Sequence, residues 1–108
     1  MQITYPASYL RAAKRLLKKY RNLQDDVDAL ALALEQNPKQ GSPLGRNCYK
    51  VRMAITSKGQ GKSGSARVIT CVKILADRIV ILTIYDKSER EDLVPGELDV
   101  LLLDAGLE

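Results

Sequence analysis

An alternation of large apolar side chains with smaller or charged ones between residues 49 and 56 constrains the fold of this chain more than any other feature. The apolar positions are Tyr49, Val51, Met53 and Ile55, and they alternate with Lys50, Arg52, Ala54 and Thr56. Successive side chains of a β-strand point to opposite faces of the sheet, so this period of two predicts a strand. One face of that strand should be buried, and the other should carry cations.

Two further runs are rich in β-branched residues and extend the expected sheet. The run ARVITCVKIL covers residues 66–75 and the run RIVILTIY covers residues 78–85, with Asp77 in a tight turn between them. The second run is apolar on both faces, as expected where helices cover one side of a strand and other structure covers part of the other side. Short connections between the three strands predict an antiparallel meander.

The N-terminal third has helical periodicity. Residues 2–5 alternate weakly and predict a short strand, after which Pro6 suits the first turn of a helix. The apolar positions of this helix are expected at Ala7, Leu10, Ala13 and Leu17. Asn22 is a suitable N-cap for a second helix that ends at Asn37-Pro38. The apolar stripe of the second helix is expected to be Leu23, Val27, Leu30 and Leu34.

A loop and a short helix complete the expected elements. Residues 38–47, PKQGSPLGRN, are rich in Pro and Gly and are predicted to form a loop. The tail predicts a helix that starts near Pro95. The apolar side of that helix is Leu98, Leu101 and Leu102. The fold class is therefore α+β, with an N-terminal helical hairpin packed on a small antiparallel β-sheet in one domain over residues 1–108.

Charge is distributed unevenly along the chain, whose formal net charge is +4. Between Glu35 and Asp77 there are eight bases and no acid, whereas from Asp86 to the end there are eight acids and two bases. The eight bases are Lys39, Arg46, Lys50, Arg52, Lys58, Lys62, Arg67 and Lys73. A basic middle beside an acidic tail favours a phosphate-bearing partner, although a solvated surface accounts for such a run as well.

The residue types present exclude several kinds of chemistry. The chain has no histidine, which excludes Ser-His and Cys-His catalysis and leaves Lys, Arg, Tyr, Asp and Glu for any acid–base step. Cys48 and Cys71 lack CxxC spacing, so they predict two semi-buried thiols and no metal site. We find no apolar run long enough for a transmembrane span and no secretory signal, so a cytoplasmic protein is expected.

The stretch KGQGKSGSAR at residues 58–67 raises the possibility of a nucleotide loop, because Gly59, Gly61 and Gly64 fit G-x-G-x-x-G. A Walker A motif requires a glycine where Thr56 stands, and both phosphate-binding motifs must lead into a helix, whereas a strand follows here. A kinase glycine-rich loop does lie between strands, but the chain has neither an HRD nor a DFG element. Two interpretations remain, a soluble hairpin tip and a cationic loop that contacts a sugar-phosphate backbone.

A helical hairpin, then CYKVR, then a glycine-rich hairpin into GSARV, then IVILTIYDKSEREDL, resembles the RelE/ParE superfamily of bacterial toxins. The segment Gly61–Leu93 looks closest to the HigB-like branch, and the likeness spans roughly residues 40 to 95. The resemblance implies a RelE-like microbial RNase fold. It also implies the toxin of a type II toxin–antitoxin pair, with a small DNA-binding antitoxin as partner.

RelE-like proteins enter the ribosomal A site and cleave mRNA there without metal or cofactor. The 2′-hydroxyl attacks the adjacent phosphate and leaves a cyclic phosphate and a 5′-hydroxyl. An enzyme of this kind must hold the backbone in line, stabilise extra negative charge at phosphorus and move two protons. Arginines and lysines can do the first two, and a lysine among other cations can do the third.

Carried over residue by residue, the resemblance places four catalytic groups. Lys50 and Arg52 match the basic strand positions, Arg67 matches the arginine that begins the next strand, and Lys87 lies in the segment after the last strand. Arg52 and Arg67 are expected to clamp the phosphate, Lys50 to transfer a proton and Lys87 to stabilise charge. The expected RNA-binding residues are Lys58, Lys62, Lys73 and Arg46.

Two positions depart from the family pattern. RelE carries an arginine soon after the last strand and a tyrosine in the tail, where this chain has Ser88 and Val94. This departure keeps open a second function, a ParE-like inhibitor of a topoisomerase that acts by binding alone. Glu89, Glu91 and Asp92 are interpreted as helix-capping and surface charge in preference to catalytic groups.

Overall fold

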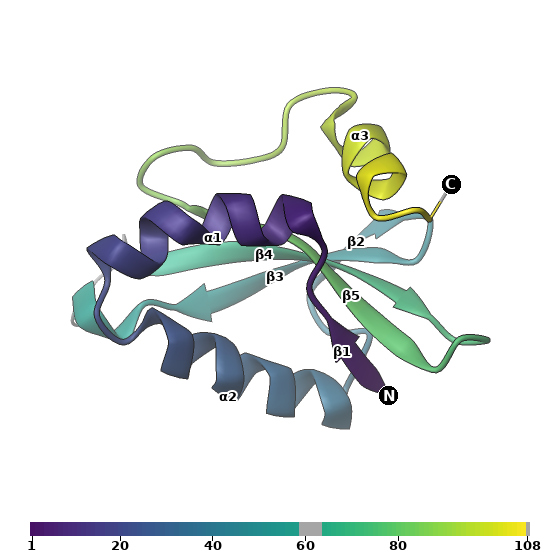
Figure 1. The fold of residues 1–108 in the computed structure, drawn as a ribbon, viewed down its shortest axis with the longest axis horizontal. Coiled ribbons are helices and arrows are strands. Elements are labelled where there is room, and N and C mark those ends of the chain that lie inside the picture. The colour runs from purple at the N-terminus through teal and green to yellow at the C-terminus, as the bar shows by residue number, and fades with distance from the viewer. Residues whose placement is uncertain (59–63, 108) are drawn as a thin grey trace.

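A computed structural model describes residues 1–58 and 64–107 of the chain. Within this part a five-stranded sheet has the order β1-β5-β4-β3-β2. The strands are β1 (Gln2–Thr4), β2 (Ser42–Gly45), β3 (Cys48–Ala54), β4 (Ser65–Lys73) and β5 (Arg78–Asp86). The helices are α1 (Ala7–Lys19), α2 (Leu23–Gln36) and α3 (Glu97–Asp104), and η1 (Thr56–Lys58) is a 3₁₀ turn. Figure 1 shows the extended segment that leaves β5 and leads past α1 to α3.

The predicted meander is confirmed. β3, β4 and β5 pair antiparallel in chain order, and Asp77 turns the chain between β4 and β5 with a φ of 52°. The expected first strand is also present, but β1 pairs parallel with β5. The sheet is therefore mixed, and the expectation of a purely antiparallel sheet was wrong at this edge.

The prediction of a loop over residues 38–47 was also wrong, because part of this segment forms the edge strand β2, which pairs antiparallel with β3. Arg46 and Asn47 both have positive φ and make the tight turn between the two strands. The chain enters β2 at Gly41, where an added Cβ would lie 2.5 Å from the carbonyl oxygen of Lys50. A short edge strand bounded by Pro and Gly shows no apolar alternation, so its sequence resembles a loop.

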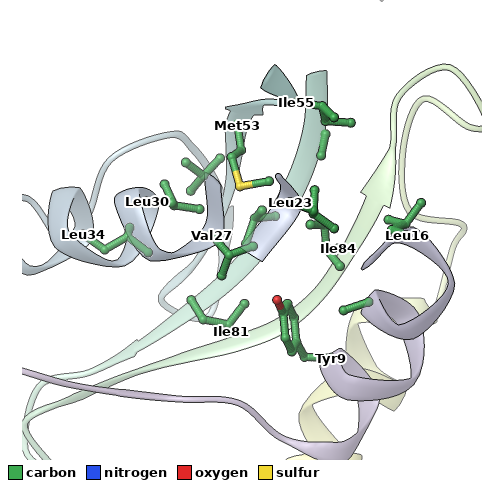
Figure 2. Packing of buried hydrophobic residues seen from close by; sticks show 14 of the residues in the cluster. Tyr9, Leu16, Leu23, Val27, Leu30, Leu34, Met53, Ile55, Ile81 and Ile84 are labelled. Atoms are coloured by element: carbon green, nitrogen blue, oxygen red, sulfur yellow. The ribbon is translucent and has the colours of Figure 1, made fainter. Parts of the chain in front are cut away.

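The two faces of the sheet are covered differently. α1 packs on β5 and α2 packs on β3, and both helices bury their side chains in one cluster on the same face of the sheet. Figure 2 shows this cluster, in which Val27 and Leu30 of α2 and Tyr9 of α1 point toward Ile81 and the other strand residues. On the opposite face, α3 covers only part of the sheet with Leu101 and Leu102. The predicted α+β architecture with a helical hairpin on a sheet is confirmed.

The stripe predicted for α2 is buried as expected, but the one predicted for α1 is rotated. Leu10 and Leu17 are 58% and 37% exposed, while Tyr9 and Leu16 face the core together with Ala13. Both sets of residues have helical spacing, so periodicity could not choose between them. The buried set is the one that contains the large ring of Tyr9, which packs in one cluster with residues of β5 and α2.

Among residues 1–58 and 64–107, none of the helices combines the length and apolarity needed to cross a membrane. The same residues contain no cluster of three or more Cys, Asp or Glu side chains that could bind a metal ion.

Candidate functional site

An open cleft of about 550 Å³ lies on the sheet face that α3 leaves partly uncovered. It is lined by Gly41, Ser42, Lys50, Arg52, Arg67, Lys87, Glu91 and Asp92. The four residues predicted to be catalytic from the sequence all line this cleft. They come from β3, from β4 and from the turn after β5, so the fold brings together residues far apart in the chain.

The arginines of the cleft are held by strand pairing. Arg52 on β3 lies directly opposite Arg67 on β4, and Arg67 lies directly opposite Tyr85 on β5. Directly opposed side chains share a face and have Cβ atoms about 5 Å apart, and like charges in such a pair repel. Two guanidinium groups in this position favour an anion between them, because arginine binds phosphate oxygens through several N–H groups at once.

The cations of the cleft differ in how strongly they are held. The guanidinium of Arg67 donates to the hydroxyl of Ser65 at 3.0 Å and to the carbonyl of Ala66 at 3.4 Å. Within the described residues, the side chains of Arg52 and Lys87 make no hydrogen bond or ion pair with protein. One cation is therefore pre-oriented, and two can turn toward a ligand.

Lys50 lies among other cations as expected, but it also has an acidic partner. Its ammonium group is 3.1 Å from a carboxylate oxygen of Asp92. The N–H of Leu93 and the ammonium of Lys50 hold the pKa of Asp92 below its usual range. Because Asp92 is 57% exposed, this pair can open at little cost when another anion arrives. Four cations and two carboxylates leave the cleft with an excess of two positive charges.

Three of the four residues predicted to bind RNA, Lys58, Lys73 and Arg46, lie outside this cleft. Lys58 makes an ion pair of 3.0 Å with Asp86, and its ammonium lies 5.5 Å from the centre of the Tyr20 ring. Arg46 pairs with Asp99 of α3, and Lys73 ends β4 six residues beyond Arg67, about 20 Å along the strand. Lys62 lies outside the described residues.

The two positions that depart from the family pattern contribute nothing to the cleft. The Ser88 hydroxyl donates to Asp86 at 2.7 Å, and Val94 is 60% exposed beyond the cleft walls. The acidic residues around them have mixed roles. Glu89 accepts two hydrogen bonds from Arg15, at 2.9 and 2.6 Å, whereas Glu91 and Asp92 line the cleft. None of the three caps α3, because that helix begins at Glu97 with Gly96 as its N-cap.

Tyr85 is the residue at the back of the site that sequence reasoning missed. Its ring is buried, its hydroxyl donates to the carbonyl of Glu91 at 3.4 Å, and the guanidinium of Arg90 lies over the ring at 4.5 Å. Arg90 in turn forms two hydrogen bonds to Glu97. These contacts fix the acidic wall of the cleft. The sequence signal for them was an aromatic residue at the end of an apolar strand, opposite Arg67.

Comparisons with known proteins bear on both the sequence and the fold. A family model described as the RelE toxin of the RelE / RelB toxin–antitoxin system matches residues 9–106. Among solved structures, the chain is similar to a double arginine-to-alanine mutant of the Escherichia coli toxin RelE in the free state, with a TM-score of 0.58 and 14% identity. That match covers 83% of this chain and 86% of the other. At this identity the structural likeness concerns the fold.

Proposed function

Because this chain belongs to the RelE toxin family, whose members are toxins of type II toxin–antitoxin systems, we propose that it cleaves mRNA on the ribosome with the cationic cleft. An antitoxin partner follows from the family. In this proposal the small DNA-binding antitoxin keeps the toxin inactive. The free toxin acts in the cytoplasm, where the ribosome presents mRNA to its cleft.

The observation that carries the proposal is the convergence of Lys50, Arg52, Arg67 and Lys87 on one open cleft. A polyanionic substrate requires a cationic surface, and an excess of two positive charges in the cleft supplies one. The cleft is also open enough to admit a nucleotide in a single strand of RNA. A buried pocket would not admit a chain that continues on both sides.

In the proposed reaction the 2′-oxygen forms a bond to phosphorus and the bond from phosphorus to the 5′-oxygen breaks. Arg52 and Arg67 clamp the phosphate from two opposed strands, and Lys87 stabilises the negative charge that develops on it. The 2′-hydroxyl loses a proton and the leaving 5′-oxygen gains one. Lys50 is the proposed proton-transfer group. Its ammonium group becomes available when an RNA phosphate displaces Asp92, and it then donates a proton to the leaving 5′-oxygen, while the 2′-hydroxyl proton passes to solvent water in the open cleft.

The test uses purified ribosomes programmed with a defined mRNA, with cleavage read by primer extension. We expect cuts in mRNA when the protein is added. Arg67→Ala combined with Lys50→Ala should abolish the cuts. Lys14→Ala is the matched control, because Lys14 is an exposed cation of α1 outside the cleft and its loss should leave the rate unchanged. Unchanged cleavage by the double variant would overturn the assignment.

A second candidate is a ParE-like inhibitor of a topoisomerase that acts by binding alone. Ser88 is held by Asp86 and Val94 lies away from the cleft, so the two departing positions add no reactive group. Growth arrest without mRNA cleavage, together with loss of supercoiling by purified gyrase, would favour this function. Cleavage with normal supercoiling would exclude it.

A further inference from the structure

A buried carboxylate next to the cleft takes no part in the chemistry described so far. Asp86 is the last residue of β5 and its side chain is fully buried. Its two oxygens accept hydrogen bonds from the Tyr20 hydroxyl at 2.5 Å, the Lys58 ammonium at 3.0 Å, and the Ser88 N–H and hydroxyl at 2.9 and 2.7 Å. Four donors surround one carboxylate.

This degree of hydrogen bonding keeps Asp86 ionised inside the protein. Burial alone would raise the pKa of Asp86, but hydrogen bonds from Tyr20, Ser88 and Lys58 outweigh it and hold the pKa well below its usual range. A buried charge is costly unless it is paired and hydrogen-bonded, so each donor contributes to keeping the arrangement intact. The donors come from three places: the junction of α1 and α2, the 3₁₀ turn η1 and the turn after β5.

The same residue controls the backbone of the turn that carries Lys87. The carbonyl of Asp86 accepts hydrogen bonds from the N–H groups of Glu89 at 3.0 Å and Arg90 at 3.2 Å. The N–H of Lys87 donates to the carbonyl of Ser65 at 3.2 Å. Backbone hydrogen bonds thus hold the turn at Lys87 and on both sides of it, while the Lys87 side chain lines the cleft.

The anchor at Ser65 links the turn to the other strand of the site. The Ser65 hydroxyl accepts a hydrogen bond from Arg67 at 3.0 Å, while the Ser65 carbonyl holds the backbone of Lys87. The buried residue Ser65 therefore holds two cleft residues at once, Arg67 through its side chain and Lys87 through its backbone. A shift of the turn would change the position of Lys87 relative to Arg67.

We propose that Asp86, together with Tyr20 and Lys58, is a positioning network that fixes the turn and thereby places the Lys87 ammonium group in the cleft beside Arg67. None of the three lines the cleft, so they act through Lys87. The catalytic consequence rests on the proposed function, whereas the effect on the turn does not. The network also explains why Lys58 points away from the cleft although it belongs to the basic middle of the sequence.

The first experiment measures the turn itself and needs no activity. In Tyr20→Phe, amide hydrogen exchange followed by NMR should become about tenfold faster at Ser88, Glu89 and Arg90, the size expected for one lost hydrogen bond to a charged group. Tyr9→Phe is the matched control, because it removes the same atom from a second buried tyrosine, which lies within α1. Unchanged exchange in the turn, or an equal increase throughout β3 and β4, would overturn the proposal.

The second experiment measures coupling to Lys87 in the ribosome cleavage assay. Tyr20→Phe should lower kcat about tenfold with little change in KM. In a Lys87→Ala background it should cause no further loss, because the residue it positions is gone. Additive losses would overturn the proposal. If the unmodified protein does not cleave RNA, the proposed function fails, and the exchange measurement still decides whether the network fixes the turn.

Discussion

Two pairs of identical residues on the same two strands have opposite environments. Cys48 and Cys71 are opposed at one end of the β3–β4 pair, and Arg52 and Arg67 are opposed four residues further along. The cysteines are buried, and a hydrogen bond between the two side chains together with burial raises the pKa of Cys48. The arginines face the open cleft. One sheet face is thus a core at one end and an open cationic cleft at the other.

The difference is caused by the reach of α3. Leu101 and Leu102 cover the half of the face that contains Cys48, Ile69 and Cys71. Beyond the helix, Glu91 and Asp92 in the segment after β5 line one side of the cleft, and the arginines stay open to it. Burying apolar side chains stabilises the first half, whereas the opposed charges of the second half cost stability. The predictions below test this division.

The largest effect is expected at the cationic half. Arg67→Ala should lower cleavage about 10²- to 10³-fold, the loss typical of removing a group that stabilises charge in the transition state. Its free energy of unfolding should change little or rise, because a repulsive pair with Arg52 is removed. Ribosome cleavage assays and urea unfolding measure the two quantities. A large loss of stability with only a small loss of activity would contradict the division.

The covered half should give the reverse result. Leu102→Ala removes a buried side chain under α3 and should lower the free energy of unfolding by about 2–5 kcal/mol. The rate of cleavage per folded molecule should stay within a few-fold of the original, because Leu102 does not line the cleft. Urea unfolding and cleavage measured at low temperature test both statements. Leu103→Ala is the control, because Leu103 is the exposed neighbour on the same helix.

Acidification should destabilise the protein through Asp86. Its pKa in the folded state is below the value of about 3.9 for an unfolded aspartate, so the folded state binds fewer protons in this range. The stabilisation is fully present above about pH 5 and is lost as the pH falls through the unfolded pKa toward the folded one. The free energy of unfolding should therefore fall between pH 5 and pH 3, measured with urea. This slope should be smaller in Tyr20→Phe than in Tyr9→Phe, and equal slopes would contradict the role of the Tyr20 hydroxyl.

The smallest effect is expected at the acidic wall. Asp92→Asn removes a negative charge from the cleft and leaves Lys50 to meet an incoming phosphate directly. Binding of a single-stranded RNA should tighten a few-fold at low salt, and the gain should vanish at high salt. Titration by fluorescence anisotropy measures it. Asp104→Asn is the control, because Asp104 pairs with Arg11 outside the cleft. An equal gain in both variants would mean that only net charge matters.

Local patterns in the sequence determined much of the sheet and three of the cleft cations. The period of two around Val51 placed Lys50 and Arg52 on one face, since side chains alternate along any strand. The β-branched runs predicted β4 and β5, and they placed Arg67 on the strand that follows the one with Lys50 and Arg52. Residue type also limited the chemistry, because a chain without histidine must move protons with other groups.

Tertiary structure alone decided the features that depend on contacts between distant segments. Strand register set Arg52 opposite Arg67, and packing rotated α1 so that Leu10 faces solvent. Lys50 pairs with Asp92, which lies 42 residues further along the chain, and Lys58 pairs with Asp86, which lies 28 residues further along. Composition and spacing describe each residue by its neighbours in sequence, whereas burial and pairing act on neighbours in space. For that reason the sequence could indicate which cations were candidates, and only the fold could show which of them meet in the cleft and which one pairs with Asp86.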